Sequence, residues 1–167
     1  MPDRPIGVSE YGADALITWH SAKPKNHDYT EEYQAMYHAQ VQKIFAARSY
    51  LWATHVWNMF DFAADARDEG GCQGRNNKGL VTYDRKTKKD AFYLYKAAWN
   101  DAPVIHVCGR RFTDRAPGER DVTVYCNRPE VTLQVNGKEV SSRSGDGYVF
   151  TFRDVPLSEG ANSVKAV

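Results

Sequence analysis

The hydrophobic pattern of this chain changes period near Pro103, and no other feature limits its fold as strongly. Before that point, an apolar run ending at Glu10 is followed by a helical pattern, an aromatic strand-like run and a second helical pattern. After it, short runs of alternating apolar residues are separated by Gly, Pro and Asp. The order predicts an α/β region at residues 1–102 followed by an all-β domain at residues 103–167.

The first helical pattern has both a start signal and an apolar face. Thr30 or Asp28 can cap a helix whose first turn carries Glu31 and Glu32, where negative charge favours the helix dipole. Apolar residues then recur at intervals of three and four, so this stripe is expected to face the core. The stripe consists of Tyr33, Met36, Tyr37, Val41, Ile44 and Phe45.

Two further elements complete the first region. Residues 51–62 form a run rich in aromatics and β-branched residues, which predicts a strand. Residues 90–99 predict a second helix with Asp90 as its N-cap, and a basic, glycine-punctuated loop lies between the two. The order strand, helix, strand, loop, helix is typical of successive units of an α/β barrel.

The second region predicts a small β-sandwich of the immunoglobulin-like kind. Asn136-Gly137 is a strong hairpin signal between two alternating runs. About five strands are visible where such a domain uses about seven, so the domain is expected to be truncated. The expected strands span residues 104–107, 122–126, 131–135, 148–152 and 163–167.

Composition narrows the function classes. The 22 Lys and Arg residues against 21 Asp and Glu give a net charge of +1, which predicts neither nucleic acid nor an acidic membrane as a partner. No apolar run is long enough for a membrane span, and the opening residues predict no signal peptide. Cys72, Cys108 and Cys126 lack metal-site spacing, and we expect Cys108 and Cys126 to be buried thiols rather than a disulfide.

The most specific functional signal is Ser9-Glu10-Tyr11-Gly12. It puts a carboxylate at the C-terminal tip of a predicted strand, where parallel sheets and barrels keep their chemistry. Glu10 is therefore the first candidate catalytic residue. On these four residues alone, a surface or capping glutamate is the alternative.

The order of motifs around Glu10 resembles the glycoside hydrolases of family two, which include β-galactosidases and β-glucuronidases. The resemblance covers roughly the first hundred residues. The matching segments are Ser9-Glu10-Tyr11-Gly12-Ala13, His20-Ser21, Glu31-Glu32-Tyr33-Gln34, residues 56–62, Asn76-Asn77-Lys78-Gly79, residues 84–86 and residues 89–99. It implies the C-terminal portion of a (β/α)8 TIM barrel followed by an immunoglobulin-like domain. A whole barrel takes about 250 residues, so the chain is expected to be the tail of a longer polypeptide.

The resemblance also implies a mechanism. Retaining glycosidases use one carboxylate as nucleophile and a second as acid/base. Glu10 matches the nucleophile of the family. The acid/base lies in an Asn-Glu pair that does not occur in this sequence, so it is expected upstream, and the isolated chain is expected to be inactive.

Five further residues match substrate-binding positions of the family. Trp57 matches the tryptophan under the sugar, although it also fits a barrel-core aromatic. Asn76 and Lys78 match the Asn-x-Lys with which β-glucuronidases hold a uronic carboxylate. Similar Asn-x-Lys-Gly segments are also common in galactosidases of the sandwich-bearing type, so this pair does not decide between the two sugars. Asn58 and His20 lie in matching runs, and a structural role for His20 is the alternative.

We therefore expect a fragment of a retaining exo-β-glycosidase that acts on terminal β-D-galactosides. A β-glucuronidase of the same family, or a non-catalytic carbohydrate-binding or assembly module, is the alternative. No metal or cofactor is implied. The expected partners are a carbohydrate and the missing N-terminal part, with self-association as a homo-oligomer through residues 33–45 or 54–62. The sequence does not determine the cell compartment, and a periplasmic or secreted full-length protein is one option.

Overall fold

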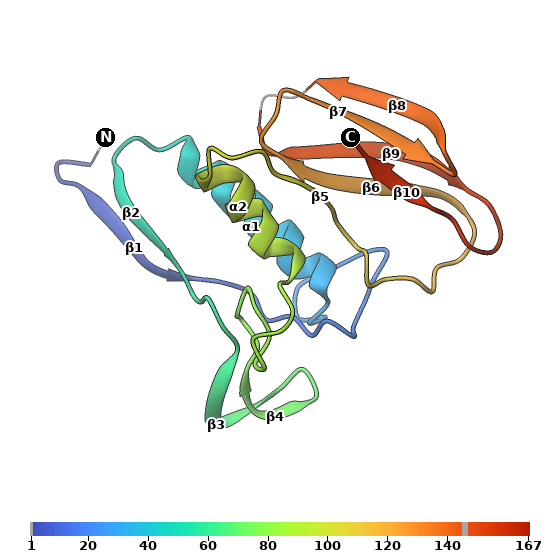
Figure 1. The fold of residues 1–167 in the computed structure, drawn as a ribbon. Coiled ribbons are helices and arrows are strands. Elements are labelled where there is room, and N and C mark those ends of the chain that lie inside the picture. Colours follow the sequence, from blue (N-terminus) through green and yellow to red (C-terminus); the bar gives the residue numbers. More distant parts are fainter. Residues whose placement is uncertain (1, 145–146) are drawn as a thin grey trace. The chain divides into compact units, whose positions relative to one another are not determined.

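The computed structural model describes residues 2–144 and 147–167, which form mostly strands and two helices (Figure 1). The chain divides into two compact units, Met1–Phe92 and Tyr93–Val167. We describe each unit by itself. Neither described helix is long and apolar enough to cross a membrane.

In the first unit, strand β1 (Ile6–Tyr11) lies parallel to β2 (Leu51–Val56), and helix α1 (Glu31–Ala46) connects them in sequence (Figure 1). This is the predicted strand, helix, strand order. Strands β3 (Phe62–Glu69) and β4 (Cys72–Asn76) then form an antiparallel hairpin. Helix α2 (Asp90–Trp99) follows, and the boundary between the two units falls within it.

Helix α1 begins as predicted but buries a different face. The Thr30 hydroxyl accepts the N–H of Tyr33 at 3.1 Å, which makes Thr30 the N-cap. The predicted apolar stripe is wrong as the core face, because its members are half-buried and Ile44 is 47% exposed. The buried residues of α1 are instead Glu31, Gln34, Ala35 and His38. Glu31 accepts the N–H of Asp90 and Gln34 donates to the carbonyl of Ala13, contacts that an apolar stripe cannot make.

The second unit is a two-sheet sandwich. One sheet has the order β5-β6-β9 and the other β10-β7-β8 (Figure 1). All of its neighbouring strands run antiparallel. The strands are β5 (Ile105–Val107), β6 (Gly118–Cys126), β7 (Glu130–Val135), β8 (Lys138–Ser144), β9 (Val149–Leu157) and β10 (Val164–Ala166).

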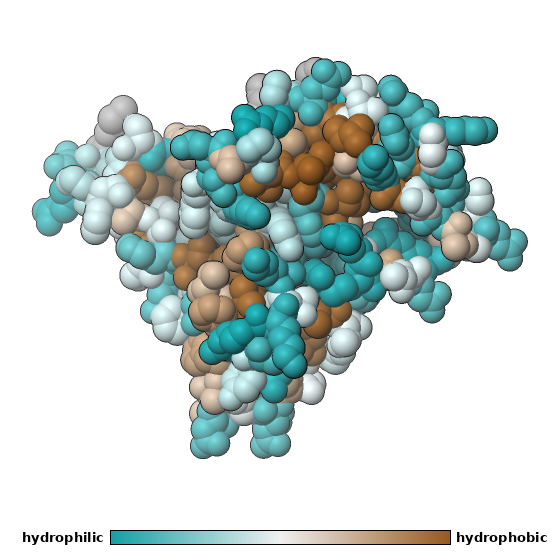
Figure 2. All heavy atoms as spheres, viewed as in Figure 1, coloured by the Kyte–Doolittle hydropathy of each residue, from teal (hydrophilic) through white to brown (hydrophobic). Residues whose placement is uncertain are grey.

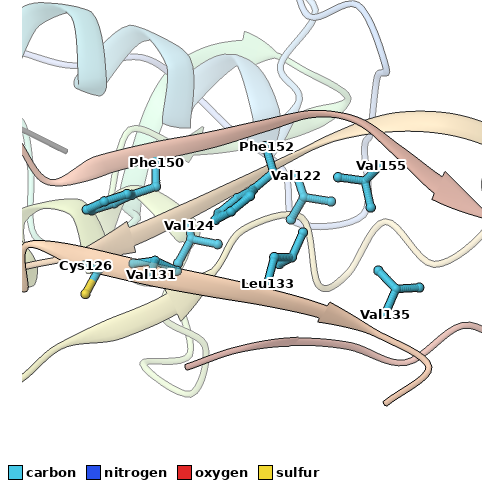
Figure 3. Packing of buried hydrophobic residues seen from close by; sticks show 9 residues of the cluster. All are labelled: Val122, Val124, Cys126, Val131, Leu133, Val135, Phe150, Phe152 and Val155. Atoms are coloured by element: carbon cyan, nitrogen blue, oxygen red, sulfur yellow. The ribbon is translucent and has the colours of Figure 1, made fainter. Parts of the chain in front are cut away.

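Alternating side chains from the two sheets make the core of the sandwich (Figure 3). Val124 and Phe152 come from one sheet, and Val131 and Leu133 from the other, each at most 1% exposed. A β-strand points every second residue to the same face, so the period-two pattern of the sequence produces this core directly. The expected β-sandwich is thus confirmed, and β8 extends the hairpin at Asn136-Gly137.

Several sequence expectations need correction. The strand predicted over residues 51–62 ends at Val56, and the peptide between Trp57 and Asn58 is cis. The glycine-punctuated stretch expected to be a loop contains the β3–β4 hairpin. Helix α2 starts at Asp90, so this residue is its first helical residue rather than its N-cap. The cysteines are thiols, but only Cys126 is buried and Cys108 is half-buried.

Apolar groups also reach the surface, where Figure 2 shows brown atoms among the hydrophilic ones. In the first unit Trp52 is 71% exposed and Met59 is 47% exposed. Single exposed apolar residues are ordinary, and only a contiguous apolar patch marks an interaction surface.

Candidate active site

Glu10 lies at the carboxyl end of β1 with an exposed side chain. The pairing with β2 is irregular at this point: Val8 pairs with Thr54, whereas Tyr11 pairs with Val56. One extra residue is therefore accommodated on β1, at Ser9-Glu10. A bulge of this kind changes the direction of a side chain at the rim of a sheet. The arrangement presents the Glu10 carboxylate outward, next to the end of β2.

Trp57 is joined to the segment after Glu10 by its backbone. Its N–H donates to the carbonyl of Tyr11 at 2.7 Å. A side chain at Gly12 would place its Cβ 2.0 Å from the carbonyl oxygen of Trp57, so only glycine fits there. The indole is 37% exposed and makes an edge contact with the ring of Phe62. The close approach at Gly12 thus brings an accessible indole face near the end of β1.

The Asn76–Lys78 loop is held by its own turn and by Asp14. The Oδ1 atom of Asn76, which is 4% exposed, accepts the N–H of Lys78 at 3.0 Å. Asp14 accepts the N–H of Asn77 at 3.0 Å through one oxygen, and its other oxygen lies 3.3 Å from the ammonium of Lys78. The guanidinium of Arg67 lies 3.3 Å from the same Asp14 oxygen. Arg67 also pairs with Glu69, so two cations and two carboxylates balance in this cluster.

Asn58 and His20 have local partners. The Oδ1 atom of Asn58 accepts the N–H of Phe60 at 3.2 Å, and its carbonyl accepts the N–H of Leu80. His20 Nδ1 lies 2.8 Å from Glu32 in the first turn of α1. The structure therefore joins Glu10, Trp57, Asn58 and the Asn76–Lys78 loop through neighbouring backbone contacts. It gives His20 a separate contact with α1, which fits the structural alternative.

A buried ion pair lies beneath this loop. The ammonium of Lys89 donates to Asp61 at 2.9 Å, and its side chain is 0% exposed. Burial lowers the pKa of Lys89 and raises the pKa of Asp61, and the opposite charge of each partner works against the shift of the other. The pair lines a cavity of about 280 Å³ that Arg75 and Tyr83 also border. Another cavity, of about 920 Å³, is lined by residues of the second unit and by no predicted site residue.

Sequence reasoning missed the residues that support the loop. Gln34 on α1 donates to the carbonyls of Ala13 and Gly79 at 2.8 and 3.2 Å. Gly79 donates its N–H to Asp61, and a Cβ at Gly79 would lie 2.1 Å from the backbone nitrogen of Asp61. The available signals were polar residues within otherwise apolar runs, such as Gln34 in its helical pattern and Asp61 within the aromatic run of residues 51–62. Both positions have a polar partner because a buried polar group without one is costly.

His38 provides a pH-dependent test of the first unit. It is 0% exposed, and burial, together with the charge of Lys89, lowers its pKa to about 3. The folded state thus keeps His38 neutral, while the unfolded chain binds a proton below pH 6.5. Stability is full above that pH and falls as the pH is lowered towards 3. We expect a loss of about 2 kcal/mol between pH 7 and pH 5. Denaturant unfolding at both values measures it, and His38→Gln should remove this part of the dependence.

A family model described as "Domain of unknown function (DUF4982)" matches residues 118–167. A curated β-glucuronidase of Bacteroides fragilis is 40% identical over 171 residues, which cover 98% of this chain and 25% of that protein. The chain thus spans about a quarter of the length of this relative.

Two solved structures are similar throughout the chain. The "FMN-binding beta-glucuronidase from Facaelibacterium prausnitzii L2-6" is 53% identical with a TM-score of 0.93, and the match covers 96% of this chain and 25% of that chain. A putative β-galactosidase from Bacteroides fragilis is 37% identical with a TM-score of 0.89, covering 97% and 25%. These relatives are glycoside hydrolases by name. The predicted resemblance to the family-two glycoside hydrolases is confirmed.

Proposed function

We propose that this chain is part of a retaining β-glucuronidase in which Glu10 is the nucleophile. Residues 1–102 would form the C-terminal portion of a TIM barrel and residues 103–167 an immunoglobulin-like domain. The parallel β1–β2 pair with α1 between them supports the first assignment, and the two-sheet sandwich supports the second. The acid/base carboxylate is contributed by an earlier part of the polypeptide, as is most of the barrel wall.

The sugar assignment replaces the β-galactoside expected from the sequence. The names of the relatives favour the alternative, a β-glucuronidase. The observation that carries the proposal is the ion pair between Lys78 and Asp14, four residues after Glu10. A glucuronide differs from a neutral sugar by a carboxylate, which a fixed ammonium recognises through a charge-assisted hydrogen bond. Arg67 pairs with the same Asp14 oxygen as well as with Glu69, so Asp14 keeps a cation when the ammonium of Lys78 binds the substrate carboxylate.

The chemistry follows from these positions. The Glu10 carboxylate attacks the anomeric carbon and forms a glycosyl ester while the acid/base protonates the departing oxygen. Water then attacks the same carbon, and the acid/base removes its proton, so the anomeric configuration is retained. The exposed indole of Trp57 packs against the apolar face of the sugar, and its ring electrons favour the positive charge of the transition state. Asn76 and Lys78 hold the uronic carboxylate, and Asn58 borders the same region.

A β-galactosidase is the second candidate, because one similar structure carries that name. In that case the ammonium of Lys78 would serve only its ion pair with Asp14. His20 is proposed to support the site from α1 through Glu32. Self-association through residues 33–45 or 54–62, which include the exposed Ile44 and Met59, stays a prediction.

The test compares nitrophenyl glucuronide with nitrophenyl galactoside on the complete polypeptide. We expect kcat/KM for the glucuronide to be higher by about tenfold or more, since a charge-assisted contact contributes about 1.5–3 kcal/mol. The 167-residue chain alone is the control and is expected to cleave neither sugar. A clear galactoside preference would reverse the sugar assignment. Sugar binding by the isolated chain, followed by tryptophan fluorescence, without activity of the complete polypeptide would favour a binding module.

A further inference from the structure

The buried ammonium of Lys89 uses all three of its N–H donors. It donates to the carbonyl of Ala15 at 2.8 Å, to Asp61 Oδ1 at 2.9 Å and to the carbonyl of Asn77 at 2.9 Å. An ammonium group has three donors, so no further contact is available to it. The residue therefore has no donor left for a substrate and can act only through the groups it holds.

The three acceptors belong to the three segments that carry the candidate site. Ala15 follows Asp14 in the segment after Glu10. Asp61 follows the Trp57-Asn58 peptide, and Asn77 stands between Asn76 and Lys78. The Asn77 carbonyl also accepts the N–H of Ala15 at 3.0 Å, so Lys89 completes a closed set of contacts among these segments.

Stability alone does not explain why a charged residue occupies the buried position of Lys89. Burying an ion pair is expensive, and an apolar pair of similar volume is often as stable. Asp61 accepts both Lys89 and the N–H of Gly79, and Lys89 also donates to the carbonyls of Ala15 and Asn77. A long cation reaches all of these acceptors from one position, which an apolar side chain cannot do.

We propose that Lys89 is a positioning residue for sugar recognition, which fixes the backbone of Asn77 and thereby holds Asn76 and Lys78 in place beside Asp14. The proposal rests on the proposed function, because Lys78 is taken to bind the uronic carboxylate. Lys89 contacts no substrate. A displacement of about 1 Å of a recognition group is enough for a large loss of rate.

The test uses Lys89→Met and the double variant Lys89→Met/Asp61→Asn in the complete polypeptide. The single variant leaves Asp61 buried without its cation, so part of its effect is lost stability. The double variant removes both charges and keeps an oxygen for the N–H of Gly79, so it should recover much of the melting temperature. Lys86→Met, an exposed lysine three residues earlier, is the matched control.

The readout is kcat/KM for nitrophenyl glucuronide relative to nitrophenyl glucoside, which has a hydroxymethyl group in place of the carboxylate. We expect this ratio to fall about tenfold or more in both Lys89 variants, mainly through a higher KM for the glucuronide, and to be unchanged in Lys86→Met. A double variant that recovers the ratio together with the melting temperature would show that Lys89 only stabilises the fold. Parallel losses on both sugars would overturn the proposal as well.

A protein-only measurement separates this proposal from the proposed function. If the unaltered polypeptide cleaves no glucuronide, the proposed function fails, and amide hydrogen exchange of the 167-residue chain decides whether Lys89 positions the loop. The N–H groups of Asn77 and Ala15 should exchange about tenfold faster in the double variant than in Lys86→Met, because Lys89 no longer holds their segments. Equal exchange in the two proteins would refute the positioning role.

Discussion

Glu10→Gln is expected to lower turnover of the complete polypeptide on nitrophenyl glucuronide by about three orders of magnitude or more. The amide keeps the size and shape of the side chain but cannot form the glycosyl ester, so the covalent route is lost. Glu10 is exposed at the end of β1, and substitutions at such positions change stability by about 0.5 kcal/mol or less. The expected result is therefore a folded and nearly inactive protein.

Steady-state kinetics and thermal unfolding of the same preparation provide the measurement. Asp65→Asn, which changes an exposed acid on β3 in the same way, is the matched control and should retain nearly full activity. Labelling with a 2-fluoro glucuronide followed by peptide mapping identifies the nucleophile directly. A label on any acid other than Glu10, or a Glu10→Gln protein with more than a few per cent of activity, contradicts the assignment.

The periodicity of the sequence predicted the sandwich better than it predicted the first unit. In the second unit, Val131, Leu133 and Val135 alternate along β7 and all face the core, so the period of the pattern is the period of the structure. In α1 the same kind of argument chose the wrong face. Burial there follows the hydrogen bonds of Gln34 and the packing of His38 rather than hydrophobicity.

The β3–β4 hairpin was missed for a related reason. Its strands carry charged residues such as Asp65, Arg67 and Arg75, and residues of β3 alternate between exposed and half-buried positions. A hydrophobic pattern is weak where neither face is fully buried. The two glycines at its turn, Gly70 and Gly71, both have positive φ angles. A Gly-Gly dipeptide is typical of a turn, so it was the feature of the sequence that could have predicted this hairpin.

The candidate site also has one part that the sequence predicted and one part that it did not. Motif order identified Glu10, Trp57 and Lys78 without any knowledge of contacts. The residues that fix them depend on pairs far apart in sequence: Asp14 and Asn77 are separated by 63 residues, and Lys89 and Ala15 by 74. A single sequence does not show which residues that are far apart along the chain are in contact. From the sequence, Lys89 next to Asp90 is typical of a charged surface turn. Only the fold shows that Lys89 is buried among three acceptors.

Lys78→Met is the second change with a large expected effect. If the ammonium binds the uronic carboxylate, its removal should lower kcat/KM for nitrophenyl glucuronide about 10- to 100-fold, the equivalent of about 1.5–3 kcal/mol. Activity on nitrophenyl glucoside should stay within about twofold or rise, since no carboxylate is present to lose its partner. Steady-state kinetics on both sugars measure the two effects in one protein.

The control must separate recognition from the ion pair with Asp14. Lys78→Met also removes a cation from Asp14, but Arg67 still lies 3.3 Å from that carboxylate and the N–H of Asn77 still donates to it. Asp14 therefore keeps two of its three partners, and stability should change little. Lys23→Met removes an exposed lysine from the same unit and should leave both activities unchanged. Equal losses on glucuronide and glucoside would mean that Lys78 only orders the loop, and the second candidate, a β-galactosidase, would then explain the site better.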